Sequence, residues 1–177
     1  WAICEESSWV YSAHLKNRHS TELPALDPGT DIDLGSAMTG LLLGETLHIL
    51  AELVHDEIAE RVRHELDRRL LVPYRSDSNF HWMHIASNWN SVCHCGVVAT
   101  AIYRAMEAHA LADMIGKAQT HLKTYLDGFD PEGGSAEGLG YWSFGFGHFL
   151  LLNDFIERRT GGEYSLFDQD TNLVSSI

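Results

Sequence analysis

Apolar side chains that recur every three or four residues constrain the fold of this chain more than any other feature of its sequence. Three segments carry the repeat: Leu43, Leu47, Leu50 and Val54; Ile58, Val62, Leu66 and Leu70; and Leu111, Ile115, Ala118, Leu122 and Tyr125. This spacing places the apolar residues on one face of a helix. We therefore expect three amphipathic helices, and no segment alternates with the period of two that is typical of a strand.

Three further helices are indicated by weaker patterns. Residues 88–107 are small or apolar with few charges, which predicts a buried helix, and residues 136–159 form another candidate. Residues 2–15 form the weakest one, because their middle is rich in poor helix formers. Turn residues separate the candidates at 23–29, 72–74 and 127–134. Together these features predict one all-α domain over residues 1–177, built of antiparallel helical hairpins.

Composition excludes several classes of protein. The chain has 177 residues and a formal charge of −13, from 12 Lys and Arg against 25 Asp and Glu. Its Arg residues cluster among acidic ones at 60–69, so no basic stripe exists for nucleic acid. No apolar run reaches the roughly 18–20 residues of a membrane span. The chain starts at Trp1 with no signal peptide after it, so we expect a piece of a longer protein.

Residues 80–96 concentrate polar and aromatic side chains just before and within the predicted buried helix. The segment holds His81, His84, Asn88, Trp89, Asn90 and His94, and Ser87 is placed to cap the helix. Such residues at a helix start can be held rigidly at the edge of a cleft. They can equally be core residues and caps, and the pattern alone leaves both interpretations open.

A glycine-rich loop at residues 127–136 leads into a second group of candidate residues, Glu137, Tyr141 and Trp142. Four glycines from 138 to 147 are unfavourable in a helix, by about 0.8–1 kcal/mol each relative to Ala. Either close helix packing or the approach of a ligand to the backbone would explain them.

Two other kinds of site have little support. Cys93 and Cys95 would point about 200° apart on a helix, and no CxxC or HExxH spacing is present, so we expect no metal. We also expect no cofactor in this chain. Apolar neighbours would raise the pKa of both thiols, which argues against a cysteine nucleophile, and the odd set of three cysteines with Cys4 indicates free thiols.

The two segments nonetheless resemble a known family. Asn88-Trp-Asn-Ser-Val-Cys-x-x-Gly96 and Asp127-Gly-Phe-x-x-x-Gly-Gly-x-x-Glu137-Gly-x-Gly-Tyr-Trp-x-Phe-Gly-Phe-Gly147 are similar to the helical domain of heparinase II/III-like polysaccharide lyases. Glu5-Glu-Ser-x-Trp9, Ala13-His14, Pro73-Tyr74 and Phe80-x-Trp-Met83 extend the likeness over nearly the whole chain. The resemblance implies part of an α/α toroid, with a β-sandwich domain downstream that completes the active site.

The activity implied by this resemblance is β-elimination at a uronic acid. The reaction needs a group that neutralises the substrate carboxylate, a base for the C5 proton and an acid for the leaving oxygen. The family pattern assigns Asn88 to the carboxylate and Tyr141 to the acid. A free tyrosine has a pKa of about 10, which suits an acid better than a base. His84 and His94 are the candidates for the base, since Trp89 stands where related lyases carry a histidine.

The remaining expectations concern the ligand. Trp89 and Trp142, and next Trp9, are candidates to stack on sugar rings, with Asn90 and Glu137 as polar substrate contacts. The negative charge of the chain fits a highly sulfated substrate poorly, so we expect a plain or lightly sulfated uronate polymer or oligosaccharide. The resemblance implies a bacterial protein, in the cytoplasm or the periplasm. A carbohydrate-binding domain without turnover, and an α/α-barrel glycoside hydrolase that uses Glu137 with a second carboxylate, remain alternatives.

Overall fold

The structure is a computed structural model that describes residues 1–15, 31–76 and 79–169. Its elements are α1 (Ala2–Glu5), α2 (Ser12–Leu15), α3 (Leu34–Ile49), α4 (Asp56–Leu66), the π-helical η2 (Asp67–Leu71), α5 (Val72–Ser76), the 3-10 helix η3 (His81–His84), α6 (Asn88–Tyr103), α7 (Ala108–Leu126), α8 (Leu139–Thr160) and the 3-10 helix η4 (Leu166–Gln169). The described residues contain no strand, only an isolated bridge between Phe129 and Ser135. The domain is therefore all-α, as predicted; the turn expected at 23–29 lies outside the described residues.

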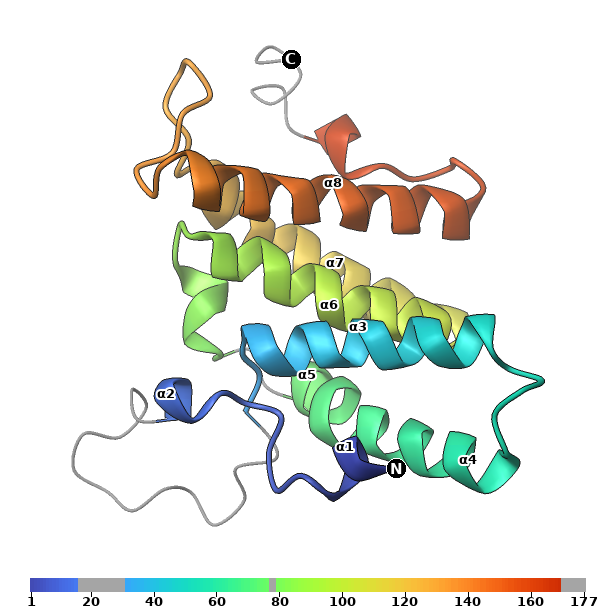
Figure 1. Ribbon diagram of the computed structural model, residues 1–177. Helices are drawn as coiled ribbons and strands as arrows, with labels where there is room; N and C mark the ends of the chain where they lie inside the picture. Colours follow the sequence, from blue (N-terminus) through green and yellow to red (C-terminus); the bar gives the residue numbers. More distant parts are fainter. Residues whose placement is uncertain (16–30, 77–78, 170–177) are drawn as a thin grey trace.

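Three long helices run side by side in the same direction (Figure 1). Helix α6 lies between α3 and α8. Residues further along α6 contact residues further along α3 and further along α8. A Cβ on Gly40 would lie 3.0 Å from Thr100, and one on Gly44 would lie 3.3 Å from Tyr103. Helices α4 and α7 run back in the opposite direction (Figure 1). Helices α3 and α4, and α6 and α7, therefore form antiparallel hairpins, and α8 runs parallel to α3 and α6.

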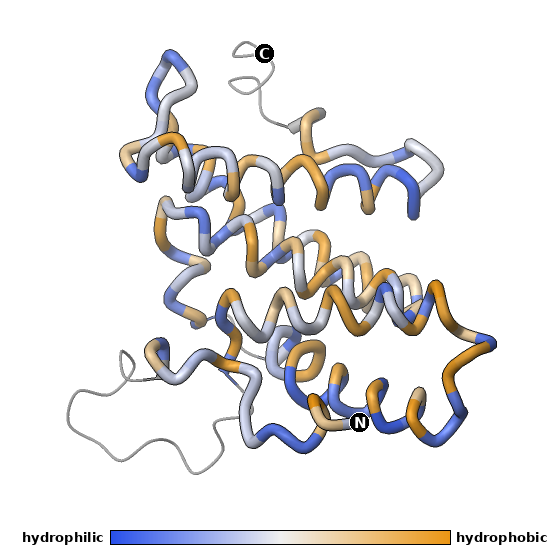
Figure 2. The backbone as a smooth tube through the Cα atoms, viewed as in Figure 1, coloured by the Kyte–Doolittle hydropathy of each residue, from blue (hydrophilic) through white to orange (hydrophobic). Residues whose placement is uncertain are grey.

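Helix α6 forms the centre of the core. Every residue from Asn90 to Ala101 is buried, which agrees with the low charge of this segment. Hydrophobic and near-neutral residues occupy much of the middle of α6 in Figure 2, whereas α4 alternates between hydrophilic and hydrophobic residues. Glycine allows the close approach of α3 and α6, because a Cβ on Gly96 would lie 2.5 Å from the carbonyl oxygen of Ala37.

The first predicted helix differs from the observed α3 at both ends. Helix α3 begins before the predicted helix, at Leu34, because Asp33 and Ser36 form a capping box with reciprocal hydrogen bonds of 2.8 Å. It ends at Ile49, so the apolar spacing through Val54 runs past its end, and Leu53 is 83% exposed. His55 then caps α4, whose first turn contains Asp56 and Glu57.

Pro73 does not break the chain where the sequence predicted a turn. The π-helical segment η2 widens the helix just before it, so that the Val72 amide donates to the carbonyl of Asp67, five residues back. A proline ring normally clashes with the carbonyl four residues earlier. The wider turn changes the distance between the proline ring and that carbonyl. The chain therefore stays helical from α4 through η2 into α5, which contains Pro73.

The expected helix over residues 2–15 is two short helices, α1 and α2, separated by a turn. Trp9 lies in that turn and is only 6% exposed; its indole donates to the carbonyl of Ile3, and the Arg69 guanidinium lies over its ring. The sequence predicted Trp9 to stack on sugars. The structure places it in the core instead.

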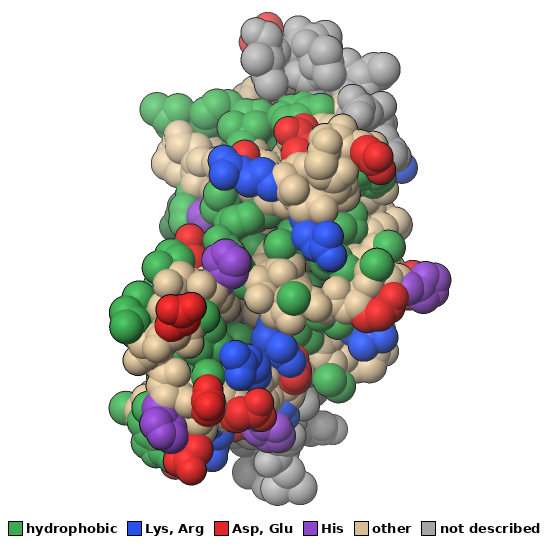
Figure 3. Space-filling model, turned by 90° about the vertical axis from the view of Figure 1, so that its right-hand side faces the viewer, with side chains coloured by type: hydrophobic (Ala, Val, Ile, Leu, Met, Phe, Trp, Pro, Cys, Tyr) green, Lys and Arg blue, Asp and Glu red, His purple; other side chains and the backbone are tan. Residues whose placement is uncertain are grey.

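Arginines form no basic stripe in the described part of the chain. Arg61, Arg68 and Arg69 all pair with the buried carboxylate of Glu65, at 3.2, 2.8 and 2.6 Å. Burial alone would raise the pKa of Glu65, but the hydrogen bonds from Arg69 and Arg68 hold it below its usual value. Figure 3 shows charged side chains of both signs spread over one face and hydrophobic ones along its upper edge.

Candidate functional site

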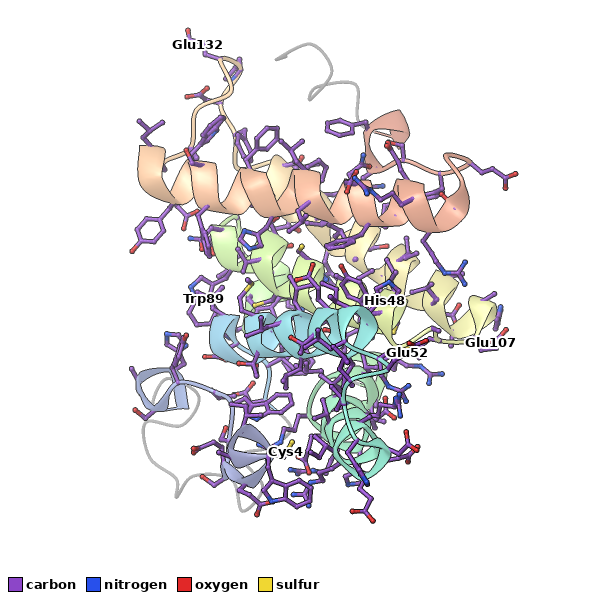
Figure 4. The ribbon with its side chains drawn as sticks, turned by 45° about the vertical axis from the view of Figure 1, so that its right-hand side comes forward. Cys4, His48, Glu52, Trp89, Glu107 and Glu132 are labelled. Carbon is purple, nitrogen blue, oxygen red and sulfur yellow. The ribbon has the colours of Figure 1, made fainter. Side chains whose placement is uncertain are left out.

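The N-termini of α3, α6 and α8 lie at one end of the molecule (Figure 1). Figure 4 shows Trp89 at this end, whereas His48, Glu52 and Glu107 lie at the other. Most of the predicted site residues belong to the same end: Asn88 and Trp89 open α6, His84 ends η3, and Glu137, Tyr141 and Trp142 surround the start of α8. Helix N-termini carry partial positive charge. Asp33 caps α3 and Glu137 accepts from the first residue of α6, whereas no side chain caps α8, so the start of α8 favours a negatively charged ligand.

Glu137 and Asn88 are joined directly, although 49 residues separate them in the sequence. The Asn88 backbone amide donates to Oε2 of Glu137 at 2.7 Å, and its side-chain Nδ2 donates to Oε1 at 2.9 Å. Ser87 is the predicted cap of α6, and its hydroxyl accepts from the Trp89 amide at 3.3 Å. The carboxylate therefore fixes the first residue of α6 and balances the positive end of the helix.

Tyr125, which the sequence indicated only as a core position of α7, lies beside this pair. A Cβ on Gly145 would lie 2.7 Å from the Tyr125 hydroxyl and 2.8 Å from Cβ of Asn88, so Gly145 serves close packing. Burial, and then the negative charge of Glu137, raises the pKa of Tyr125. The Tyr125 hydroxyl and Oδ1 of Asn88 are both buried and make no hydrogen bond with the described residues.

Tyr141 lies in the first turn of α8 and is 61% exposed. It precedes Gly145 by four residues, which places both on the same side of the helix, one turn apart. Gly145 faces Asn88, and its carbonyl accepts from the Ser91 hydroxyl at 2.8 Å. The Tyr141 side chain is therefore carried on the side of α8 that faces α6, close to the start of both helices.

Trp89 lies half-buried between two histidines. Its ring centroid is 4.5 Å from that of His14 in α2 and 5.3 Å from that of His81 in η3. His14 in turn contacts Asp33, with Nδ1 and Oδ2 2.5 Å apart. In the sequence, His14 contributes only to the family likeness, because no local sequence pattern indicates that it reaches residue 89.

The loop before α8 is held by its own polar groups. Asp130 Oδ1 accepts the amides of Glu132 and Gly134 at 2.9 and 2.8 Å. The Trp142 indole donates to the Gly133 carbonyl at 2.9 Å, and its ring stacks on Phe146. The indole N–H of Trp142 thus positions the loop. Trp142 is half-buried, so part of its ring remains exposed. Gly138 ends the loop at φ 85°, a conformation that explains this glycine without a ligand.

Two of the predicted site residues are buried away from this surface. Asn90 is fully buried, and its Nδ2 donates to the carbonyls of Met83, Ile85 and His121 at 3.1–3.3 Å. His94 is also fully buried, with Nδ1 2.8 Å from the Tyr74 hydroxyl. Asn90 therefore connects α6 to η3 and α7, and His94 belongs to the core.

His84 lies at the surface, and its ring is 5.1 Å from that of His121, which stacks on His94 at 5.9 Å. In the part of the chain that the structure describes, no three His, Cys, Asp or Glu side chains converge as metal ligands. Cys4, Cys93 and Cys95 are free and buried. Burial raises the pKa of Cys95 to about 12 and also raises the pKa of Cys93 well above its usual value, in agreement with the prediction that both thiols have a raised pKa.

No family model matches the chain, and no curated protein is significantly similar to it. Among the described helices, none has both the length and the apolar character needed to cross a membrane. The function must therefore be inferred from the chemistry of the end where α3, α6 and α8 begin.

Proposed function

We propose that this chain is the helical domain of a polysaccharide lyase that cleaves uronic-acid glycans by β-elimination. One observation carries the proposal: three parallel helices begin at one end, and that end presents Tyr141, Trp89 and the Asn88–Glu137 pair. Partial positive charge at the start of α8, which no side chain caps, attracts a carboxylate, Trp89 offers an apolar ring, and Tyr141 offers an exposed hydroxyl.

In the proposed reaction a base removes the C5 proton of the uronate. The electron pair forms a double bond between C4 and C5, and the bond between C4 and O4 breaks. The Tyr141 hydroxyl donates its proton to the leaving O4. Asn88 neutralises the substrate carboxylate with the second proton of Nδ2, since Glu137 takes only the first.

The helix arrangement supports the same proposal. Parallel α3, α6 and α8, the first two of which are each followed by a returning helix, form the pattern that an incomplete α/α toroid would have. We propose that further helices and a β-sandwich domain of the same protein complete the cleft. Glu137 then has a positioning role, because it holds the first residue of α6 through two hydrogen bonds.

A second function, carbohydrate binding without turnover, is favoured by the burial of Asn88. Asn88 is only 4% exposed, and Glu137 already accepts from both its backbone and its side chain. If the amide stays engaged, the end of the bundle would bind an acidic sugar through Trp89 and the start of α8 alone. The glycan would then remain uncleaved.

The test is a measurement of ultraviolet absorbance after incubation with a panel of uronic-acid polysaccharides and oligosaccharides. Protein expressed from the complete gene and the 177-residue chain are assayed separately, and we expect absorbance from the unsaturated uronate with the former only. Tyr141→Phe should lower the rate about 100-fold or more, the usual contribution of a positioned acid. Tyr103→Phe, at the far end of α6, is the matched control and should leave the rate unchanged.

Three outcomes decide between the functions. An unchanged rate in Tyr141→Phe would remove the tyrosine from its role as acid. Binding of one polymer without any absorbance would favour the carbohydrate-binding function. Cleavage that leaves two saturated ends, abolished by Glu137→Gln, would instead indicate a glycoside hydrolase.

A further inference from the structure

Beside Trp89, the fold brings together a histidine and a buried carboxylate from two segments of the chain. His14 comes from α2, and Asp33 is the N-cap of α3. Their side chains meet with Nδ1 of His14 2.5 Å from Oδ2 of Asp33, and the two side chains are 26% and 3% exposed. The carboxylate is thus buried, while the imidazole still reaches the surface.

Asp33 is fixed by other hydrogen bonds as well. Its Oδ1 accepts the amide and the hydroxyl of Ser36 at 2.8 and 3.0 Å, and its Oδ2 also accepts the Tyr11 amide at 3.1 Å. All its partners are donors, so the carboxylate accepts from Nδ1 of His14 as well. The proton of neutral His14 therefore resides on Nδ1, and the lone pair resides on Nε2.

The imidazole lies at the candidate site. Its ring is 4.5 Å from that of Trp89, the residue that follows Asn88 on the first turn of α6. A sugar placed against Trp89 would therefore lie near the imidazole ring of His14. The two histidines expected as bases are placed differently: His94 is buried against Tyr74, and His84 packs against His121.

We infer that His14 is the catalytic base of the proposed elimination and that Asp33 is its positioning residue. This inference rests on the proposed function. Nε2 of His14 takes the C5 proton, the C–H electron pair becomes the C4–C5 double bond, and O4 leaves with the proton of Tyr141. His14 then gives its proton to water, and water returns one to the tyrosine. Asp33 holds Nδ1 and stabilises the imidazolium that forms.

The test uses protein from the complete gene with a uronate substrate that the wild type cleaves. His14→Ala should lower kcat about 100- to 10,000-fold with little change in KM, because a base acts on the chemical step. Imidazole added to the buffer should restore part of the rate, since the position is open to solvent. A structural role for His14 would show no such rescue. His109→Gln, an exposed position at the start of α7, is the control and should behave as the wild type.

Asp33→Asn is the second variant, because Asn also caps helices well and should keep α3 folded. Its amide nitrogen would donate to Nδ1 of His14 and move the ring proton to Nε2, so kcat should fall while helicity by circular dichroism stays unchanged. Full activity of folded His14→Ala, or a loss that imidazole does not rescue, would overturn the inference while the lyase function stands. An inactive wild type would overturn both.

Discussion

At the scale of single residues, His94 is the side chain whose protonation should matter most for stability. It is fully buried, and burial, followed by the charges of His121 and Lys117, keeps the pKa of His94 well below its usual value. Below about pH 6.5 the unfolded chain binds a proton here that the folded chain does not. The unfolding free energy should therefore decrease as the pH is lowered below this value, by up to about 1.4 kcal/mol per pH unit from this site.

Urea denaturation at pH 7 and at about pH 5 checks this expectation. His94→Gln should be less stable than the wild type at pH 7, because it loses a packed ring, but its stability should change less between the two pH values. His109→Gln, an exposed position, should keep the wild-type pH dependence. Equal pH dependence in His94→Gln and the wild type would show that other groups dominate the acid response.

The same scale shows what the sequence could predict about the candidate site. Asn88 and Trp89 adjoin in the chain, and the cap at Ser87 is a local signal, so these could be placed at a helix start. His14 could not, because it reaches Trp89 only through the packing of α2 beside α3 and α6. The role of Tyr125 was also hidden, since helical spacing identifies a core residue but not the hydroxyl that ends beside Asn88.

At the scale of elements, the contact between α3 and α6 depends on Gly96. A Cβ there would lie 2.5 Å from a backbone oxygen of Ala37, which cannot move without shifting α3. Gly96→Ala should therefore lower the unfolding free energy by about 1–3 kcal/mol, as overpacking usually does. Denaturant unfolding of the purified chain measures the change.

Gly116 in α7 provides the matched substitution. A Cβ there would meet nothing within 4 Å, so Gly116→Ala should stabilise the chain by about 0.5–1 kcal/mol through the higher helix propensity of Ala. Equal effects of the two substitutions would mean that helix propensity, and not the approach of α3 to α6, decides the outcome at Gly96.

Elements were predicted best where one face of a helix is charged. The spacing of Val62, Leu66, Leu111 and Leu122 matched α4 and α7, which are amphipathic. The first half of α3 was missed, because glycine and other small residues bury it without a clear apolar stripe. The sequence indicates a break at Pro73 for the same kind of reason, because a π-helical segment five residues long leaves no local sequence pattern.

At the scale of the whole molecule, the charge of −13 opposes the binding of any acidic polymer. The attraction proposed for the end where α3, α6 and α8 begin is local, from the start of α8 and hydrogen-bond donors within a few ångströms. The repulsion is long-range, and salt screens it, since the Debye length falls to about 8 Å at about 0.15 M. Local donors and long-range charge should therefore respond differently to ionic strength.

We expect the affinity for an acidic oligosaccharide to stay constant or to rise as salt increases from a low concentration to about 0.15 M. Proteins that bind polyanions through rows of Lys and Arg behave in the opposite way, because they release counterions. Calorimetric titration at several salt concentrations measures the trend, and the same oligosaccharide with its carboxyl groups reduced is the control and should show none. A steep loss of affinity with salt would contradict this expectation and would indicate that the ligand binds a basic surface. Among the described residues, the clustered arginines Arg61, Arg68 and Arg69 are already paired with Glu65.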